Sequence, residues 1–178
     1  MNMSMRSTLV SSRLYECLEW QMESGATFDL TATYRYRLWR EWDAALPKVG
    51  FVMLNPSRAD ATENDPTIRR CIGFAKGWGY GGLEVGNLFA YRATHPKKLC
   101  EVADPVGSEN DEYLKKLVNH VDRVILAWGN HGSLQGRDRA VLGLFQDAPI
   151  YCLGITKFQH PTHPLYLKST VLPVQYQP

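Results

Sequence analysis

Asparagine and histidine side chains follow short apolar runs along this chain, and they are the residues best suited to chemistry. Asn55 comes directly after one such run, and Asn87 ends the next. His160 and His163 follow the last run, each with a proline next in sequence. An amide can orient a water molecule through its carbonyl oxygen, and a neutral imidazole N–H can stabilise a developing anion. These residue types therefore indicate a water-dependent reaction, or ligand binding, at strand ends.

The elements that must position these residues form a repeating pattern. Short apolar runs, typical of buried parallel strands, occur at 49–54, 83–87, 123–128 and 149–154. Amphipathic spacing predicts helices between them, starting at 66, 111 and 138, the first of which is capped by Asp65. This repetition predicts an α/β fold, a three-layer α/β/α sandwich with a mainly parallel four-stranded central sheet. Because the carboxyl ends of such strands share one edge, the asparagines and histidines are expected to lie together there.

The residues before the first of these runs carry weaker patterns. Residues 31–39 alternate as a half-exposed edge strand or hairpin arm does, with Thr33, Arg35 and Arg37 set against Tyr34, Tyr36 and Leu38. Residues 15–22 form a weak helical pattern. With 178 residues the chain is expected to form one domain, with 1–30 as an N-terminal extension and 31–178 as the core.

The composition narrows the class of protein. A net charge of +2 argues against a general polyanion binder, although a local basic cluster suits a phosphate backbone: Arg69, Arg70, Lys76, Arg92, Lys97 and Lys98. No run approaches the ~18 apolar residues of a membrane span, and no signal-peptide pattern occurs, so a cytoplasmic protein without a membrane partner is expected. The chain has no Walker-type or Gly-x-Gly-x-x-Gly run, which argues against nucleoside triphosphate or dinucleotide chemistry.

The four cysteines contain no Cys-x-x-Cys pair. Cys71 lies in a helical pattern and Cys152 in an apolar run, which favours buried reduced thiols. Because zinc and iron–sulfur sites usually contain close ligand pairs, such a site is the less favoured alternative. No metal and no cofactor are therefore expected.

Taken in order, the motifs resemble those of the uracil-DNA glycosylase superfamily over about residues 34–168. The matching segments are Met53-Leu54-Asn55-Pro56-Ser57, Asn87 with 88–93, Ile125-Leu126-Ala127-Trp128-Gly129 and His163-Pro164-Leu165-Tyr166-Leu167. The segments at 65–71 and 163–166 also resemble a bacterial and phage family labelled as a domain of unknown function. The resemblance implies the fold of the superfamily and base excision, in which a nucleotide is flipped into a pocket and its N-glycosidic bond is cleaved.

The resemblance also implies a role for each matching residue. Asn55 would position the attacking water, and His163, or His160 as the alternative, would hydrogen-bond the departing base. Asn87 would read the Watson–Crick edge of the base. Phe74 and Trp78 would stack on the base, and Leu165 or Leu167 would fill the vacated stack. The residues that would contact the DNA are Leu165, Leu167, Arg69, Arg70, Arg92 and Lys168. DNA is the expected partner, and no protein partner is required.

The substrate is predicted from the residue at position 57, which is a serine. Uracil-specific members of the superfamily place a tyrosine two residues after the catalytic position, where it crowds the pyrimidine 5-position, and Ser57 stands there in this chain. A small hydroxyl side chain would admit a damaged or enlarged pyrimidine, such as a hydroxymethylated or glucosylated cytosine of phage DNA, with uracil as the other candidate. Antiphage defence is consistent with the superfamily. The chain also departs from the superfamily pattern at Met53, where glycine is usual, and at Leu165, where serine is usual.

Two other interpretations stay open. A nucleic-acid or modified-nucleotide binding module would keep the same pocket without hydrolysis, and nucleoside binding without release of the base would distinguish it. A purely structural protein would leave the polar residues at the strand ends unexplained.

Overall fold

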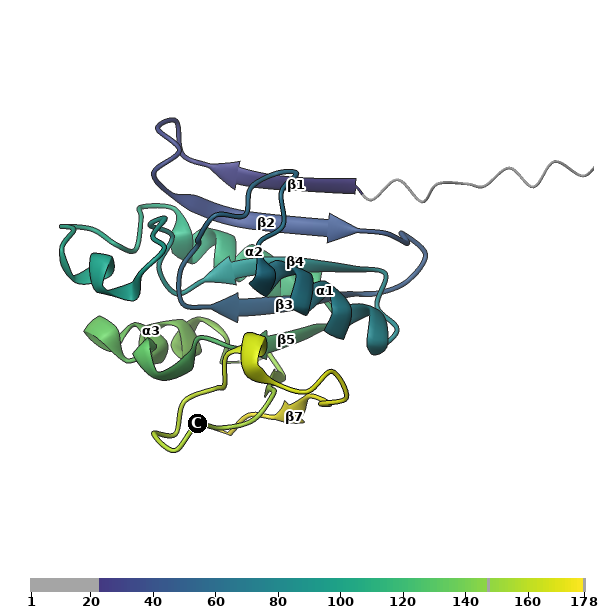
Figure 1. Cartoon of the computed structure of the whole chain (residues 1–178). Coiled ribbons are helices and arrows are strands. Elements are labelled where there is room, and N and C mark those ends of the chain that lie inside the picture. The colour runs from purple at the N-terminus through teal and green to yellow at the C-terminus, as the bar shows by residue number, and fades with distance from the viewer. Residues whose placement is uncertain (1–22, 147, 178) are drawn as a thin grey trace, which may run out of the picture.

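A seven-stranded sheet organises the computed structural model, which describes residues 23–146 and 148–177 (Figure 1). The strands are β1 (Glu23–Phe28), β2 (Arg35–Glu41), β3 (Lys48–Met53), β4 (Gly82–Asn87), β5 (Arg123–Leu126), β6 (Ile150–Cys152) and β7 (Val174–Gln175). The helices are α1 (Pro66–Gly77), α2 (Asn110–His120) and α3 (Arg137–Leu144), with short 3₁₀ turns η1 (Pro96–Cys100), η2 (Gly129–His131), η3 (Leu134–Gly136) and η4 (Pro164–Tyr166). The strand order across the sheet is β1-β2-β4-β3-β5-β6-β7.

The four predicted apolar runs form the centre of this sheet and pair in parallel, in the order β4, β3, β5, β6. Antiparallel strands extend both sides, since β2 pairs with β4, β1 with β2, and β7 with β6. The α/β class is confirmed, but the expectation of a mainly parallel four-stranded sheet is wrong, because the sheet is mixed and has seven strands. The sheet also begins at Glu23 rather than after residue 30. β7 has only two residues, which is too short for a recognisable pattern.

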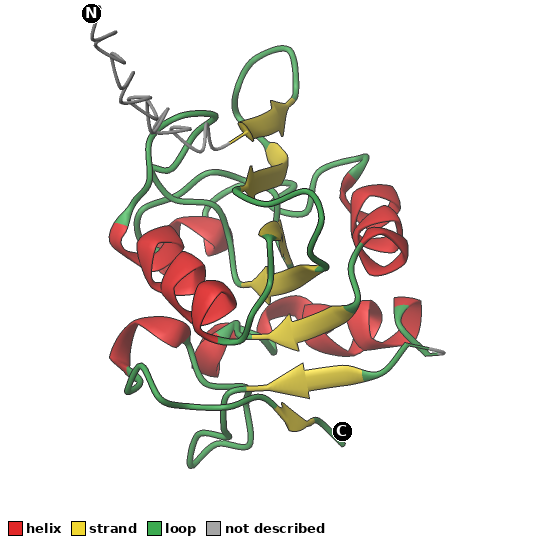
Figure 2. Ribbon diagram, turned by 90° about the vertical axis from the view of Figure 1, so that its right-hand side faces the viewer, coloured by secondary structure: helices red, strands yellow, loops and turns green. Residues whose placement is uncertain are grey.

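Helices cover both faces of the sheet and complete three layers (Figure 2). On one face α1 packs through Phe74 against Phe51 and its neighbours. On the other face α2 and α3 pack against the sheet, with Leu114 close to Leu126 in the same core. Both faces of β3 and β4 are therefore buried, which explains why these strands read as continuous apolar runs rather than as alternating ones. The Asp65 carboxylate accepts a hydrogen bond of 2.8 Å from the Ile68 N–H, which confirms the predicted helix cap.

β2 differs from the half-exposed strand that its alternation predicts. Arg35 and Arg40 are only 2% and 1% exposed. β2 lies between β1 and β4, and the loop after β3 covers it, because Arg35 donates to the Ala59 carbonyl and Arg40 to the Asp60 carbonyl. The alternation in the sequence identifies the strand, whereas the loop that buries its arginines lies 20 to 24 residues later in the chain.

The predicted helix at 15–22 and Cys17 lie outside the described residues. Cys71 and Cys152 are buried free thiols, as the sequence indicates. Burial raises the pKa of both thiols, so both stay protonated near neutral pH.

Gly86 lies in β4 directly against α2, where a Cβ would lie 2.7 Å from Leu114 Cδ2 and 3.2 Å from Leu117 Cδ1. A Gly86→Val substitution is expected to lower the free energy of unfolding by about 1–3 kcal/mol, measured by urea denaturation, because α2 must move away from the sheet. Gly73→Ala in α1 is the matched control. A Cβ at Gly73 meets nothing within 4 Å, so this variant should gain about 0.5–1 kcal/mol from helix propensity. Equal stability of the Gly86→Val and wild-type proteins would contradict the close packing of α2.

Candidate functional site

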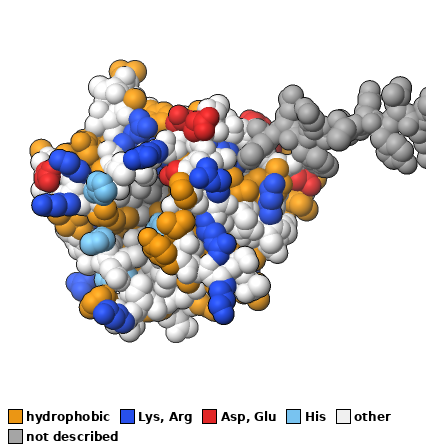
Figure 3. Space-filling view, viewed as in Figure 1, with side chains coloured by type: hydrophobic (Ala, Val, Ile, Leu, Met, Phe, Trp, Pro, Cys, Tyr) orange, Lys and Arg blue, Asp and Glu red, His pale blue; other side chains and the backbone are white. Residues whose placement is uncertain are grey.

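A cavity lies at the carboxyl edge of the parallel strands, where the strand order reverses. The connection from β3 through α1 leads to β4 on one side, and the connection from β4 through α2 leads to β5 on the other side of β3. Open α/β sheets bind ligands at such points. The cavity has a volume of about 480 Å³, within the usual range for small-ligand sites. Figure 3 shows histidine, Lys and Arg side chains around a hollow in this face, with hydrophobic side chains among them.

The strand ends and the turns that follow them supply the walls of the cavity. Its lining residues are Arg35, Met53, Leu54, Asn55, Ser57, Asp65, Thr67, Ile68, Ala93, Thr94, Pro96, Trp128, Gly129, Asn130, His131, His163 and Tyr166. Three residues singled out from the sequence, Asn55, Ser57 and His163, therefore meet in one cavity although about a hundred residues separate the first from the last.

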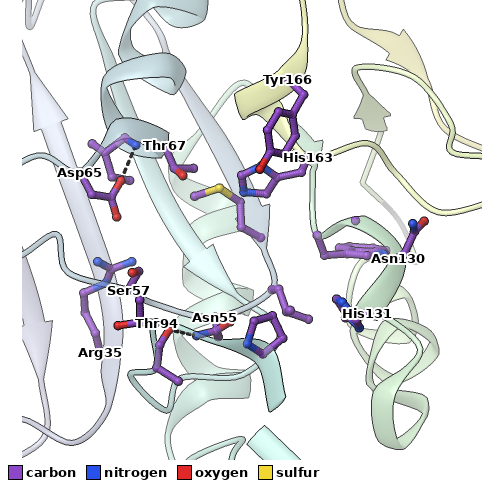
Figure 4. Close-up of a pocket in the computed structure, with 17 residues that line it drawn as sticks. Arg35, Asn55, Ser57, Asp65, Thr67, Thr94, Asn130, His131, His163 and Tyr166 are labelled. Atoms are coloured by element: carbon purple, nitrogen blue, oxygen red, sulfur yellow. Dashed lines mark hydrogen bonds between the residues drawn. The ribbon is translucent and has the colours of Figure 1, made fainter. Parts of the chain in front are cut away.

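Asn55 is held in one orientation by the backbone around it. Its Nδ2 group donates hydrogen bonds to the Pro56 carbonyl at 3.0 Å and to the Ala93 carbonyl at 2.7 Å. These bonds use both amide hydrogens, so the carbonyl oxygen is the atom of this side chain left to accept a hydrogen bond in the cavity (Figure 4). Asn55 can therefore receive a hydrogen bond from a water or a ligand hydroxyl, and it cannot turn its amide nitrogen to the same place without losing both bonds.

His163 is held as a neutral imidazole with a defined tautomer. Its Nδ1 accepts a hydrogen bond of 3.3 Å from the Leu165 N–H, and the ring thereby caps η4. Burial lowers the pKa of His163 below its ordinary value of 6.5, an effect that the Asp65 carboxylate opposes. A neutral ring with an accepting Nδ1 carries its proton on Nε2. His163 therefore offers the cavity a single N–H donor and, at neutral pH, no positive charge.

The protonation of His163 makes stability depend on pH. Because the folded pKa lies below the unfolded value, the unfolded chain binds more protons as the pH falls below about 6.5, so the free energy of unfolding should decrease there. The slope from this one group is at most about 1.4 kcal/mol for each pH unit. Urea denaturation of wild type and His163→Gln at pH 8 and pH 5.5 should show a larger acid loss in wild type. Equal acid losses would contradict a depressed pKa at His163.

His131 and Tyr166 are cavity residues to which the sequence patterns attach no role. The turn after β5 brings Asn130 and His131 to the cavity, and Gly129 starts this turn at a φ of +72°, a conformation that suits glycine. Tyr166 lines the cavity yet is 86% exposed, and its ring centroid lies 6.4 Å from that of His163. An exposed aromatic ring beside a cavity is suited to stacking on a planar ligand. In the sequence, the position of Tyr166 shortly after His163-Pro164 is the signal that indicates a place near the cavity.

Arg35 also lines the cavity without an expected role. It is 2% exposed and reaches the cavity from β2. Its Nη1 donates to the Ala59 carbonyl at 2.8 Å, and its Nη2 lies 3.4 Å from Asn87 Oδ1. The alternation at 31–39 predicts a half-exposed strand face for Arg35, so the sequence pattern does not indicate a place in the cavity.

Asn87, the expected base reader, is not among the lining residues. Asn87 is 1% exposed and contacts Arg35, which does line the cavity, while its own backbone carbonyl accepts from the Asn110 side chain. Phe74 and Trp78 stack on one another in the core, with ring centroids 5.3 Å apart, and neither lines the cavity. None of these three residues therefore contacts a ligand in the cavity. Asn87 instead supports Arg35, and Phe74 and Trp78 belong to the core.

Of the residues expected to contact DNA, some are exposed near the cavity and others have structural contacts. Leu165 is exposed beside the cavity, whereas Leu167 packs against the core. Arg70 donates to the Leu167 carbonyl and stacks over Phe74, and Arg69 donates to the Asn64 carbonyl, so both have structural contacts. His160, the alternative to His163, does not line the cavity. Lys168 is exposed, and Arg92 lines a second hollow.

Two further hollows adjoin the cavity on the surface. One, of about 480 Å³, shares Ser57, Ala93 and Thr94 with the cavity and adds Arg58 and Arg92. The other, of about 580 Å³, shares Pro96, Asn130 and His131 and adds His95 and Lys97. The three hollows follow one another across this face, with basic side chains at both ends.

The fold and the site define an α/β protein with a ligand-sized cavity at the switch point of its sheet. Residues 35–165 match the family described as "Protein of unknown function (DUF1643)", and the chain belongs to that family. No curated protein and no solved structure matches the chain. Between residues 23 and 177, residue 147 excepted, no helix is long and apolar enough to cross a membrane. The same residues contain no group of three or more His, Cys, Asp or Glu side chains that could hold a metal ion.

Proposed function

We propose that this protein is a monofunctional DNA glycosylase that excises a modified or damaged pyrimidine and leaves an abasic site. One observation carries the proposal. Asn55 presents a fixed carbonyl oxygen and His163 a neutral N–H donor to the same cavity of about 480 Å³. These are the two groups that hydrolysis of an N-glycosidic bond needs, one for the incoming water and one for the departing base.

The reaction adds one water across the bond between C1′ and the base nitrogen. Asn55 Oδ1 accepts a hydrogen bond from the water and orients its oxygen toward C1′. The C1′–N bond breaks with its electron pair passing to the base, while the sugar gains oxocarbenium character. His163 Nε2–H donates to a base oxygen that becomes negative. The water oxygen bonds to C1′, its proton passes to solvent, and the released base is protonated from solvent.

Space beside Ser57 supports an enlarged pyrimidine as the substrate. Ser57 lines the cavity and also the hollow of about 480 Å³ that opens beyond it toward Arg58 and Arg92. A substituent on the pyrimidine 5-position would pass the small Ser57 side chain and occupy that hollow. A tyrosine at this position would close the passage. Hydroxymethylcytosine and its glucosylated form are therefore the preferred substrates, in the setting of antiphage defence, and uracil is the simpler candidate.

The surface beside the cavity supports a nucleic-acid strand as the partner. Basic side chains lie in the hollows at both ends, Arg58 and Arg92 in one and Lys97 in the other. Positive charge on both sides of a cavity suits the phosphates that flank a flipped nucleotide. Leu165 and Tyr166 project beside the cavity and are suited to fill or cover the vacated base stack.

Release of free base tests the proposal. Duplexes that contain uracil, hydroxymethylcytosine or glucosylated hydroxymethylcytosine are incubated with the protein, and abasic sites are scored by alkaline cleavage. We expect release from at least one modified duplex and none from unmodified DNA. If none of the three loses its base, and Asn55→Ala behaves as wild type, the excision proposal is wrong. Tight binding of a modified nucleoside without base release would instead select a binding module.

A further inference from the structure

Three arginines are buried among the residues that the structure describes, and one of them differs from the others. Arg40 is 1% exposed and donates to the Gly25, Trp39, Asp60 and Glu63 carbonyls and to Asn64 Oδ1. Arg137 is 7% exposed and pairs with Asp111 while it donates to the Leu88 carbonyl. Arg40 is thus surrounded by acceptors, and Arg137 has a carboxylate partner. Both are structural.

Arg35 lacks this compensation. Two of its five N–H groups have acceptors, the Ala59 carbonyl and Asn87 Oδ1, and its buried Nε has none among residues 23–146 and 148–177. No ion pair within that part of the chain includes Arg35. A buried guanidinium with unpaired N–H groups is costly, and a ligand that supplies the missing acceptors would remove this cost.

Arg35 remains charged under ordinary conditions. Burial lowers its pKa to about 10, and the Asp65 carboxylate opposes this effect. Asp65 lines the same cavity, but its carboxylate accepts the Ile68 N–H at the start of α1 and forms no ion pair with Arg35. The cavity therefore contains a positively charged donor, Arg35, as well as the neutral N–H of His163.

The position of Arg35 indicates what these donors meet. In Figure 4 the Arg35 guanidinium and the His163 ring lie on different sides of the cavity, with Asn55 at its base. A planar ring between them would receive N–H groups at two separate edges. A guanidinium only donates, so the group that faces Arg35 must be an acceptor such as a carbonyl or an anionic oxygen.

We propose that Arg35 is a further catalytic residue that binds the departing base as an anion, opposite His163. This inference rests on the proposed glycosylase function. As the C1′–N bond breaks, its electron pair passes to the base and delocalises onto acceptor atoms of the ring, which are O2 and N3 in a cytosine and O2 and O4 in uracil. Arg35 donates an N–H to the acceptor that His163 does not contact and keeps its proton, and the released base takes its proton from solvent. Asn87 and the Ala59 carbonyl hold the guanidinium in place.

A binding experiment tests this role without requiring turnover. The probes are barbiturate, a pyrimidine that is an anion at pH 7, and uracil, a neutral pyrimidine of the same ring size, both titrated calorimetrically. We expect wild type to bind barbiturate at least ten-fold more tightly than uracil, and Arg35→Gln to lose that preference. Arg35→Lys should keep part of it, because the charge remains while the fork of donors is lost. Arg123→Gln is the matched control, because Arg123 lies at the start of β5 and does not line the cavity.

Three results would overturn the inference. The first is that wild type binds neither probe at millimolar concentration, and the second is that it binds both equally. The third is that Arg35→Gln keeps the preference for the anion while its thermal unfolding shows a folded protein. Should Arg35→Gln fail to fold, the preference in Arg35→Lys decides, since it must then fall below that of wild type. Failure of base release with a preserved anion preference would count against the glycosylase proposal alone, so the two failures are distinguishable.

Discussion

An Asn55→Ala variant is expected to release base at least about 10²-fold more slowly than wild type under single-turnover conditions. The reason is the fixed orientation of this amide. Its two hydrogen bonds, to the Pro56 and Ala93 carbonyls, leave Oδ1 to hold the water, and alanine offers no acceptor. Single-turnover conditions isolate the chemical step from product release. The affinity for substrate DNA should change little, since the backbone charges supply most of it.

Two variants sharpen this prediction. Asn119→Ala, on an exposed residue at the end of α2, is the matched control and should act as wild type. Asn55→Asp would place a carboxylate oxygen against two carbonyl oxygens that now accept from Nδ2 at 3.0 and 2.7 Å. We expect it to lower the free energy of unfolding by about 1–3 kcal/mol, because buried acceptors then lack donors. Full base release by Asn55→Ala would remove Asn55 from the mechanism.

His163→Gln is expected to slow base release by about 10²–10³-fold, the usual effect of removing one donor to a developing anion. Glutamine keeps a hydrogen-bonding side chain of similar length but cannot reproduce both the Nδ1 cap on Leu165 and the Nε2 donor. The loss should fall on the chemical rate rather than on DNA binding, as expected of a contact made mainly in the transition state.

His160→Gln is the matched comparison, and it decides between the two histidines of this loop. His160 does not line the cavity, so its substitution should leave the rate within about two-fold of wild type, the scatter expected of a residue away from the chemistry. The pH profile adds a second check. Because the pKa of His163 is depressed by burial, base release should be constant above neutral pH and change only on the acid side. A large effect at His160 with none at His163 would reverse the assignment.

Most of the central fold could be predicted, because its signals are local. The apolar runs and the amphipathic helices between them are periodicities read over a few residues, and Asp65-Pro66 marks a helix start by the geometry of its own turn. The antiparallel strands were harder. β1 is half-exposed and β7 has two residues, and their pairing depends on partners elsewhere in the chain.

In the candidate site, too, some features could be predicted from the sequence and others could not. Asn55 and Ser57 lie just after β3, and His163 lies in the loop that follows β6. The parallel arrangement of the strands brings the segments that follow them to one edge. Asn87 ends β4, yet its side chain contacts Arg35 and does not line the cavity. Strand register places a residue at the edge, but the packing of the neighbouring elements decides which way the side chain points.

The sequence by itself determined the α/β class, the order of its central elements and the strand-end residues that meet at one cavity, because these follow from short-range patterns and from the geometry of parallel sheets. Only the tertiary structure decided which residues face that cavity. Arg35 looks like a surface residue in an alternating strand, and it becomes a buried cavity cation because β1 covers one side of β2 and the loop through Ala59 covers the rest. Burial and side-chain direction depend on contacts between distant segments, and no local pattern records them.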